Sequence, residues 1–190
     1  ALMPTNRRFT FDVRKILYQI FDVDSFMETR IDMGRAVVTG LARMEGIPMA
    51  ILASDCRHLG GAIDSDSATK MTALYQLAES WGLPVVAFID TPGFMVGPES
   101  EADGAPSLMS DAFIAGAALN QPIIAVFLRR AYGLGAMAMA GGSFEVPRYS
   151  VSWPQGEFGA MGLEGAVHLG FRQELANASD EAARQALFES

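Results

Sequence analysis

Cysteine is nearly absent from this 190-residue sequence, which contains only Cys56. A single cysteine excludes an internal disulfide and any zinc site built from several cysteines, so we expect Cys56 to be a small buried residue or a loop residue. Lysine is also scarce, because Lys15 and Lys70 are the only lysines among 14 basic residues. The formal net charge is −8, and no stripe of basic residues with interleaved aromatics is present. We therefore expect no nucleic-acid partner.

Long apolar runs are missing as well. No stretch approaches the roughly 20 apolar residues that a membrane-spanning helix needs, and the opening residues ALMPTNRRFTFD lack the apolar centre of a signal peptide. We therefore expect a protein without membrane contact, located in the cytoplasm or in the mitochondrial matrix. Hydrophobic residues make up 50% of the sequence and the length fits one domain, so a single packed domain over 1–190 is predicted.

Apolar residues recur at helical spacing in some segments and in short continuous runs in others. The predicted helices begin after Asp12, run from Asp64 to Gly82 and from Leu108 to Asn120, cover 162–169, and close the chain at 179–188. The predicted strands are 36–43, 47–53, 85–89 and 123–128. The first two strands are expected to form a hairpin, and the last two to be buried on both faces. This alternation of strands and helices predicts an α/β fold.

Two short motifs invite nucleotide-binding interpretations. The residues DTPG at 90–93 would suit a GTPase, but neither lysine lies in the GxxxxGK[ST] loop that such a protein needs. Residues 133–138 fit G-x-G-x-x-[GA], with Glu157 near the offset of a ribose-binding carboxylate. However, four residues separate the first glycine from the predicted strand, and Glu157 lies in WPQGEFG, a poor strand terminus. We therefore favour neither interpretation.

Side chains capable of acid–base chemistry are few and scattered. His58 is expected in a loop and His168 in a helix near a core face, with no serine or cysteine motif beside either. Glu157 and Glu164 could form a carboxylate pair. The simpler expectation places Glu157 in solvent and Glu164 in the first turn of a helix.

Charged and polar residues also follow two of the predicted strands. Asp90 and Thr91 come after the first, and Arg129 and Arg130 come after the second. The carboxyl ends of parallel strands face the binding crevice in α/β sheets. The same residues could instead form turns and carry solvated charges, and both interpretations remain open.

Glycine-rich loops follow the same two strands, DTPGFMVG from Asp90 and AYGLGAM from Ala131. Glycine lets the backbone approach a ligand closely, and backbone N–H groups where a helix begins form anion sites. Such groups can hold an oxyanion, which is worth roughly 3 kcal/mol per donor. The alternative is that these glycines serve only the tight packing of helix on strand. Two loops at equivalent places favour the anion site.

Longer segments of the chain resemble one known family. DTPGFMVGPESE, RRAYGLGAMAMAGGSFEVP and WPQGEFGAMGLEGAVHLGFRQEL are similar to the carboxyltransferase subunits of biotin-dependent acyl-CoA carboxylases. FDVRKIL, VVTGLARMEGIPMAIL and HLGGAIDSDSATK resemble the start of that family's C-terminal domain. The similarity covers about 11–175 in the family's order. It implies one C-terminal domain over 1–190, with a helix and connector in 1–30 and a truncated terminal helix in 176–190.

The resemblance implies a crotonase-like (ClpP/crotonase) fold, a spiral of ββα units, and the biotin-binding half of a carboxyltransferase. Carboxybiotin on a carrier protein would give its CO2 to the α-carbon of an acyl-CoA, while backbone donors hold the charge on the ureido oxygen. A protein base is unnecessary, because the biotin nitrogen can take the α-proton, and no metal is implied. The implied partners are an N-terminal carboxyltransferase domain, biotin carboxyl carrier protein and biotin carboxylase. The protein would be a homo-oligomer with its active site at a dimer interface.

The resemblance also assigns roles to residues of the two glycine loops. The expected catalytic donors are the N–H groups of Leu134 and Gly135, helped by the loop at Gly93 and Phe94. The residues expected to bind biotin are Tyr132, Gly133, Ala136, Met137 and Gly97. Met137 falls where family members vary with the acyl group accepted. The sequence departs from the family at Ser107 and Leu108, where members commonly carry Arg-His.

Two other functions fit the same fold. An enoyl-CoA hydratase or isomerase needs two carboxylates, and Glu157 stands where one would fall, but Met137 stands near the position of the other. A non-catalytic assembly domain would keep the fold for dimerisation alone. The missing Arg-His pair favours that interpretation, whereas the intact glycine loops oppose it.

Overall fold

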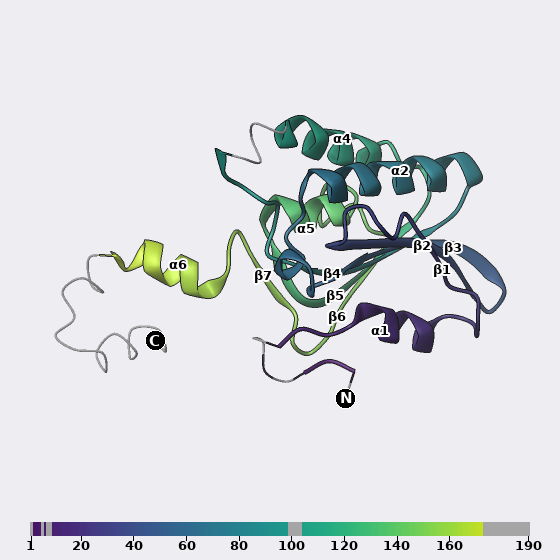
Figure 1. Ribbon diagram of the computed structural model, residues 1–190, viewed down its shortest axis with the longest axis horizontal. Coiled ribbons are helices and arrows are strands. Elements are labelled where there is room, and N and C mark those ends of the chain that lie inside the picture. Colours follow the sequence, from purple (N-terminus) through teal and green to yellow (C-terminus); the bar gives the residue numbers. More distant parts are fainter. Residues whose placement is uncertain (1, 5, 7–8, 99–103, 173–190) are drawn as a thin grey trace.

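One sheet forms the centre of the computed structural model, which describes residues 2–4, 6, 9–98 and 104–172 (Figure 1). Within those residues the sheet has seven strands in the order β1-β2-β3-β4-β5-β6, and β7 also pairs with β5. The strands are β1 Met27–Thr29, β2 Val37–Met44, β3 Ile47–Ser54, β4 Val85–Thr91, β5 Ile123–Tyr132, β6 Tyr149–Ser152 and β7 Glu157–Gly159. The first three strands are antiparallel, and the pairs from β3 onward are parallel.

The β2–β3 hairpin forms where the alternation and the Glu45-Gly46 turn predict it. Both turn residues have positive φ, 52° and 81°, which matches the right-handed twist of the flanking strands. The carboxylate of Asp22 accepts hydrogen bonds from both turn amides at 2.8 Å. β4 is buried along its whole length, as a continuous apolar run predicts.

The helices begin and end at residues suited to those positions. They are α1 Val13–Ile20, the 3₁₀ turn η1 Leu59–Gly61, α2 Ser65–Trp81, α4 Ala105–Ala117, α5 Gly133–Met139 and α6 Leu163–Gly170. Asp12 and Asp64 cap α1 and α2 by accepting hydrogen bonds from first-turn amides, and Gly82 ends α2 in the left-handed conformation. The helices and strands predicted from the apolar spacing are thus confirmed wherever the structure describes them.

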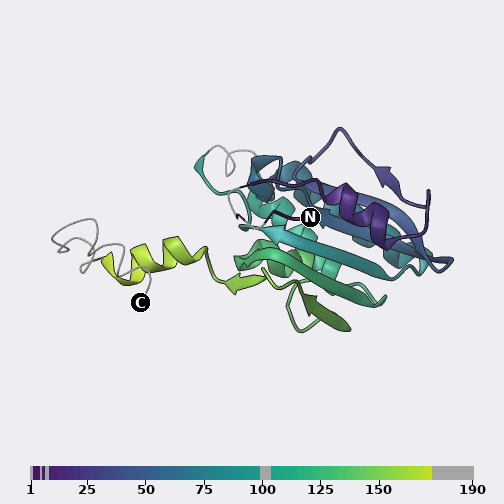
Figure 2. The ribbon, with the colours of Figure 1, turned by 90° about the horizontal axis from the view of Figure 1, so that it is seen from below.

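Helices cover both faces of the sheet. α2, α4 and α5 lie on one face and α1 on the other (Figure 1). Each face has its own apolar core, one centred on α2 and one on α1. α6 lies away from the sheet, beyond β7, in both views (Figures 1 and 2). The part of the chain that the structure describes contains no helix long and apolar enough to cross a bilayer.

Some boundaries differ from those predicted. β5 continues from the predicted end at Leu128 to Tyr132, because Arg129 and Arg130 bond to a buried carboxylate rather than to water. The segment 1–30, expected to hold a helix and a connector, also contains edge strand β1. Cys56 is buried, as expected. The predicted tail helix and the range 176–190 lie outside the described residues.

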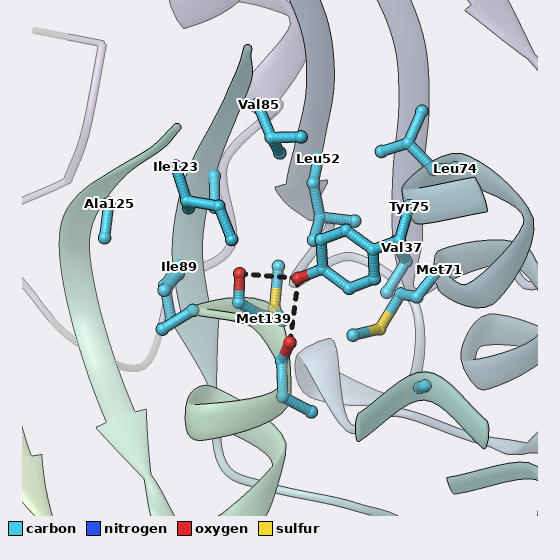
Figure 3. Packing of buried hydrophobic residues seen from close by; sticks show 14 of the residues in the cluster. Val37, Leu52, Met71, Leu74, Tyr75, Val85, Ile89, Ile123, Ala125 and Met139 are labelled. Carbon is cyan, nitrogen blue, oxygen red and sulfur yellow. Dashed lines mark hydrogen bonds between the residues drawn. The ribbon is translucent and has the colours of Figure 1, made fainter. Parts of the chain in front are cut away.

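Tyr75 ties α5 to α2 inside the larger core. Its ring is fully buried, and its hydroxyl lies 2.8 Å from the carbonyl oxygen of Ala138 and 2.9 Å from that of Met139 (Figure 3). These carbonyls belong to the last turn of α5, where the helix itself provides no donors and the carbonyls need donors from elsewhere. Burial raises the pKa of the Tyr75 phenol, so the hydroxyl stays protonated and can donate.

Asp55, directly after β3, anchors the α1 face through ionic hydrogen bonds. Its side chain is fully buried and accepts from Arg14 at 2.6 Å and from Arg57 at 2.8 and 2.9 Å. Burial by itself would raise the pKa of Asp55, but the hydrogen bonds from Arg57 and then Arg14 outweigh burial and lower that pKa below its usual value.

We expect Tyr75→Phe to lower the free energy of unfolding by about 1–2 kcal/mol, because it leaves a buried carbonyl without its donor and keeps the ring. Urea denaturation of the chain measures the change. Tyr18→Phe serves as the control, because that ring is 60% exposed and lies on a solvent-facing side of α1. Equal stabilities of the Tyr75 variant and the parent chain would contradict the assigned hydrogen bond.

Asp55→Asn should change how stability depends on pH. The ionised carboxylate stabilises the folded chain above the ordinary pKa of about 4, and this contribution is lost as the pH falls through the lowered folded pKa. The variant should therefore be less stable than the parent near neutral pH, and should lose less stability between about pH 5 and pH 2. Urea unfolding at a series of pH values measures both effects. Parallel stability curves would show that Asp55 is not the group responsible.

Candidate functional site

The two glycine loops predicted from the sequence lie against each other at the carboxyl ends of β4 and β5. A Cβ atom on Gly135 would lie 2.7 Å from the carbonyl carbon of Gly93 and 2.9 Å from the amide nitrogen of Phe94. These distances are shorter than any side chain tolerates, so the two backbones touch directly. The packing role that the sequence left open for these glycines therefore applies to Gly135. It also brings the two loops together, as the anion-site hypothesis requires.

Hydrogen bonds fix the loop that follows β4. Thr91, fully buried, donates from its hydroxyl to the Gly61 carbonyl at 2.7 Å and accepts from the Gly93 amide at 3.1 Å. Ile63 donates to the Gly93 carbonyl at 3.0 Å, and Met95 donates to the Ile63 carbonyl at 2.8 Å. The Gly93 N–H is thus already used within the chain.

The second amide expected to help in this loop is that of Phe94. Phe94 pairs with Ile63 in an isolated parallel bridge, whose hydrogen bonds are made by Gly93 and Met95. In such a bridge the N–H of Phe94 itself points to the side away from Ile63. That side is where Gly135 lies. Among the described residues no acceptor is found for the Phe94 N–H. Of the two amides expected to help in this loop, Phe94 is the one with a free donor.

The first turn of α5 has the remaining predicted donors. Tyr132 is its N-cap, and Gly133 has a φ of 57°, a conformation that suits glycine. The N–H groups of Leu134 and Gly135 lie in the first turn, where a helix offers no acceptor within itself. Within this turn Leu134 is 62% exposed, whereas Gly135 is buried.

The other residues predicted to bind biotin differ in exposure. Ala136 is fully buried and packs in the larger core, whereas Met137 is half-buried. Gly97 is half-buried and has a φ of 137°, directly after Val96, which is 83% exposed. Ser107 and Leu108 lie in the first turn of α4, where Ser107 is exposed and Leu108 packs against the core.

Glu157 is half-buried, so the expectation that it faces solvent is wrong. It is the first residue of β7, and its carboxylate accepts a hydrogen bond from the hydroxyl of Tyr132. β7 pairs with the end of β5 in the register Arg130 with Glu157, which brings the two strands together beside Tyr132. The side chains of Glu164 and His168 lie outside what the structure describes. His58 precedes η1 in a loop, as expected.

The gap expected between the strand and the first glycine of the fingerprint is wrong, because β5 runs directly into Gly133. Glu157 is the first residue of β7 and does not stand at the carboxyl end of a strand. The sequence could not show the longer strand, because the apolar run stops at two arginines. The Glu157 carboxylate is nevertheless engaged by Tyr132, which leaves the ribose role expected of a fingerprint carboxylate unsupported.

The charged residues at the strand ends form a buried ion pair network rather than solvated turns. Asp90 is fully buried and accepts from Arg129 at 2.6 Å and from Arg130 at 3.0 Å. Arg130 also donates to the Gly60 carbonyl at 2.7 Å, which ties η1 to the strand ends. The Asp90 carboxylate is thus paired with two guanidinium groups near the carboxyl ends of β4 and β5. Within the described residues no group of three histidine, cysteine or acidic side chains could hold a metal ion.

The Thr91 and Tyr132 contacts could not be anticipated from the sequence. Both depend on partners 30 and 25 residues away in the chain. Neither residue lies in a motif that signals such a bond, although both stand at the ends of predicted strands. The pairing of β7 with β5 brings Glu157 within reach of Tyr132, and the position of η1 brings Gly61 within reach of Thr91.

Comparison with known proteins identifies relatives along nearly the whole chain. The family model described as "Carboxyl transferase domain" matches residues 1–189. The uncharacterized carboxylase YngE of Bacillus subtilis is 32% identical over 95% of this chain and 35% of its own length. The biotin-dependent acetyl-/propionyl-coenzyme A carboxylase beta6 subunit of Mycobacterium tuberculosis is 31% identical over 98% of this chain and 39% of its own length. The chain thus spans little more than a third of these relatives.

Solved structures agree with this relationship. A single-chain, multi-domain long-chain acyl-CoA carboxylase shares 48% identity and a TM-score of 0.89, over 99% of this chain and 19% of that protein. Transcarboxylase 12S, solved with methylmalonyl-coenzyme A bound, shares 29% identity and a TM-score of 0.90, over 99% of this chain and 36% of that one. These matches confirm the predicted α/β fold of the crotonase-like class. By both family model and relatives above 30% identity, the chain belongs to the carboxyl transferase domain family, and it corresponds to the C-terminal domain of acyl-CoA carboxylase carboxyltransferase subunits.

Proposed function

We propose that the chain is the biotin-binding half of an acyl-CoA carboxyltransferase, which moves CO2 from carboxybiotin to the α-carbon of an acyl-CoA. Relatives named as biotin-dependent acyl-CoA carboxylase subunits support the reaction class. The contact between Gly135 and the Gly93–Phe94 backbone is the observation that carries the proposal, because it gathers amide donors from two loops at one point.

Several amide N–H groups at one point suit the ureido oxygen of biotin, which gains negative charge during the transfer. Carboxybiotin, when bound, supplies the CO2, and its ureido nitrogen supplies the base for the α-proton. The N–H groups of Phe94, Leu134 and Gly135 would hold the ureido oxygen as negative charge develops there. Gly93 contributes through its backbone contact rather than its amide, which donates to Thr91. The described residues of the two loops, 92–98 and 131–139, contain no charged side chain that would compete for the oxygen.

The residues around these donors would shape the pocket. Tyr132 and Gly133 would form one side, half-buried Gly97 and Met137 would line it, and fully buried Ala136 would support it from the core. We propose that Met137 influences the size of the acyl group accepted. The acyl-CoA itself would be held by an N-terminal carboxyltransferase domain, because this chain covers little more than a third of its relatives.

Partners follow from the same argument. Biotin has to arrive on a biotin carboxyl carrier protein after carboxylation by biotin carboxylase. Transcarboxylase 12S assembles as a hexamer, which supports an oligomer. We propose a homo-oligomer with the active site at a dimer interface. The cytoplasm, or the mitochondrial matrix, remains the compartment we propose.

The two alternative functions receive less support. Hydratase or isomerase chemistry needs a pair of free carboxylates, whereas Glu157 is engaged by Tyr132 and Met137 is apolar. A pure assembly domain would not require amides from two loops to converge. We therefore retain carboxyl transfer as the function.

Separate titrations of the chain distinguish the three functions. With a biotinylated carrier peptide we expect saturable binding, and with free acyl-CoA only weak binding, because the CoA site lies on another domain. Isothermal calorimetry measures both. Acyl-CoA binding accompanied by hydration of an enoyl-CoA would support the hydratase instead. Binding of neither ligand would support the assembly domain.

A single amide can be removed from the first turn of α5. Leu134→Pro deletes the Leu134 N–H, and proline is tolerated in the first turn of a helix. In a complete carboxyltransferase containing this chain, we expect the transfer rate to fall by about 10²-fold or more.

Leu134→Ala is the matched control, because it shortens the same exposed side chain and keeps the N–H. Its rate should stay within about threefold of the parent rate. Equal rates for the proline and alanine variants would rule out Leu134 as a donor. Gly135→Val is a poor test, because any Cβ there collides with the Gly93 backbone at 2.7 Å and disturbs the fold.

A further inference from the structure

Tyr132, the residue that precedes the first turn of α5, forms a hydrogen-bonded pair with Glu157. Tyr132 is the last residue of β5 and the N-cap of α5, and its ring is only 6% exposed. Its hydroxyl donates to Oε2 of Glu157, the first residue of β7. The pair therefore joins the strand that ends at the site to the strand that lies beside it.

The segment that follows Glu157 packs tightly on the same residues. A Cβ on Gly133 would lie 3.1 Å from the carbonyl oxygen of Ala160, and a Cβ on Gly162 would lie 3.5 Å from the Tyr132 ring. The backbone of 159–162 is thus in van der Waals contact with Tyr132 and Gly133. Because this contact leaves little free space, a shift of Tyr132 would move Gly133 and the first turn of α5 with it.

We propose that Glu157 is a positioning residue, which acts through the Tyr132 hydroxyl to fix the direction of the Leu134 and Gly135 amides. This inference rests on the proposed function. Glu157 needs only an acceptor oxygen for this role and transfers no proton. A role in acid–base catalysis would instead require an ionisable carboxyl group, so the two roles respond differently to glutamine.

The experiment uses a complete carboxyltransferase that contains this chain, with carboxylated biocytin as the CO2 donor and, as acceptor, an acyl-CoA that the parent enzyme carboxylates. We expect Tyr132→Phe and Glu157→Ala each to lower kcat by about tenfold, because misdirected donors stabilise the transition state less well. The KM for acyl-CoA should stay within about twofold, since that substrate is held elsewhere. Glu157→Gln should stay within about threefold of the parent, because its amide oxygen still accepts the bond.

The double variant Tyr132→Phe with Glu157→Ala tests whether the two residues act as one unit. Its kcat should be no lower than that of the slower single variant, because both changes break the same bond. Tyr149→Phe on β6 is the matched control, since its ring is 63% exposed, and it should leave kcat unchanged. Thermal unfolding of each variant shows whether it folds. If Glu157→Ala does not fold, Tyr132→Phe still tests the inference, because it removes only one oxygen atom.

Three results would overturn the inference while leaving carboxyl transfer intact. The first is a kcat for Tyr132→Phe equal to that of the parent enzyme. The second is a kcat for the double variant that is lowered by the product of the two single effects. The third is a kcat for Glu157→Gln as low as that for Glu157→Ala. The last result would identify Glu157 as a proton-transfer group. Absence of transfer in the parent enzyme would overturn the proposed function and this inference together.

Discussion

The contact between the backbones of Gly93 and Gly135 is the constraint on which the rest of the site depends. Two main chains can approach this closely only where neither residue has a side chain in between. Parallel pairing of β4 with β5 places the two loops at the same edge of the sheet, and the contact then fixes their separation. Donors from two segments about 40 residues apart are thereby held at one place by a contact between main chains.

Buried ion pairs stabilise this arrangement of the two loops. Asp90 lies near the end of β4, Asp55 follows the adjacent parallel strand β3, and each is paired with two arginines. A buried carboxylate without partners would be costly, whereas a paired one ties loops to the sheet through several hydrogen bonds. Arg130 reaches η1 in this way, and Thr91 reaches the same turn with its hydroxyl. These charged groups are paired with one another inside the network, and the described loop residues 92–98 and 131–139 present main-chain dipoles without charged side chains.

An uncharged site of this kind suits a reaction in which the substrate brings its own base. Proton transfer by a protein side chain would need a free carboxylate or histidine, and Glu157 is instead engaged by Tyr132. The chain spans little more than a third of its relatives, and it presents an open surface turn at Leu134. In the proposed enzyme that surface is completed by another domain, which holds the acyl-CoA.

The sequence by itself determined the elements, their order and the two loops that matter, because helical spacing, cap residues such as Asp12 and Asp64, and continuous apolar runs are local signals. It also determined the family, through motifs that extend over most of the chain. It could not determine where β5 ends, or the burial and hydrogen-bond partners of Asp90 and Glu157. Local signals placed Glu157 in solvent and left the environment of Asp90 open. Only the tertiary structure decided these, because the free energy of a charged or polar group depends on the partners that distant strands bring to it.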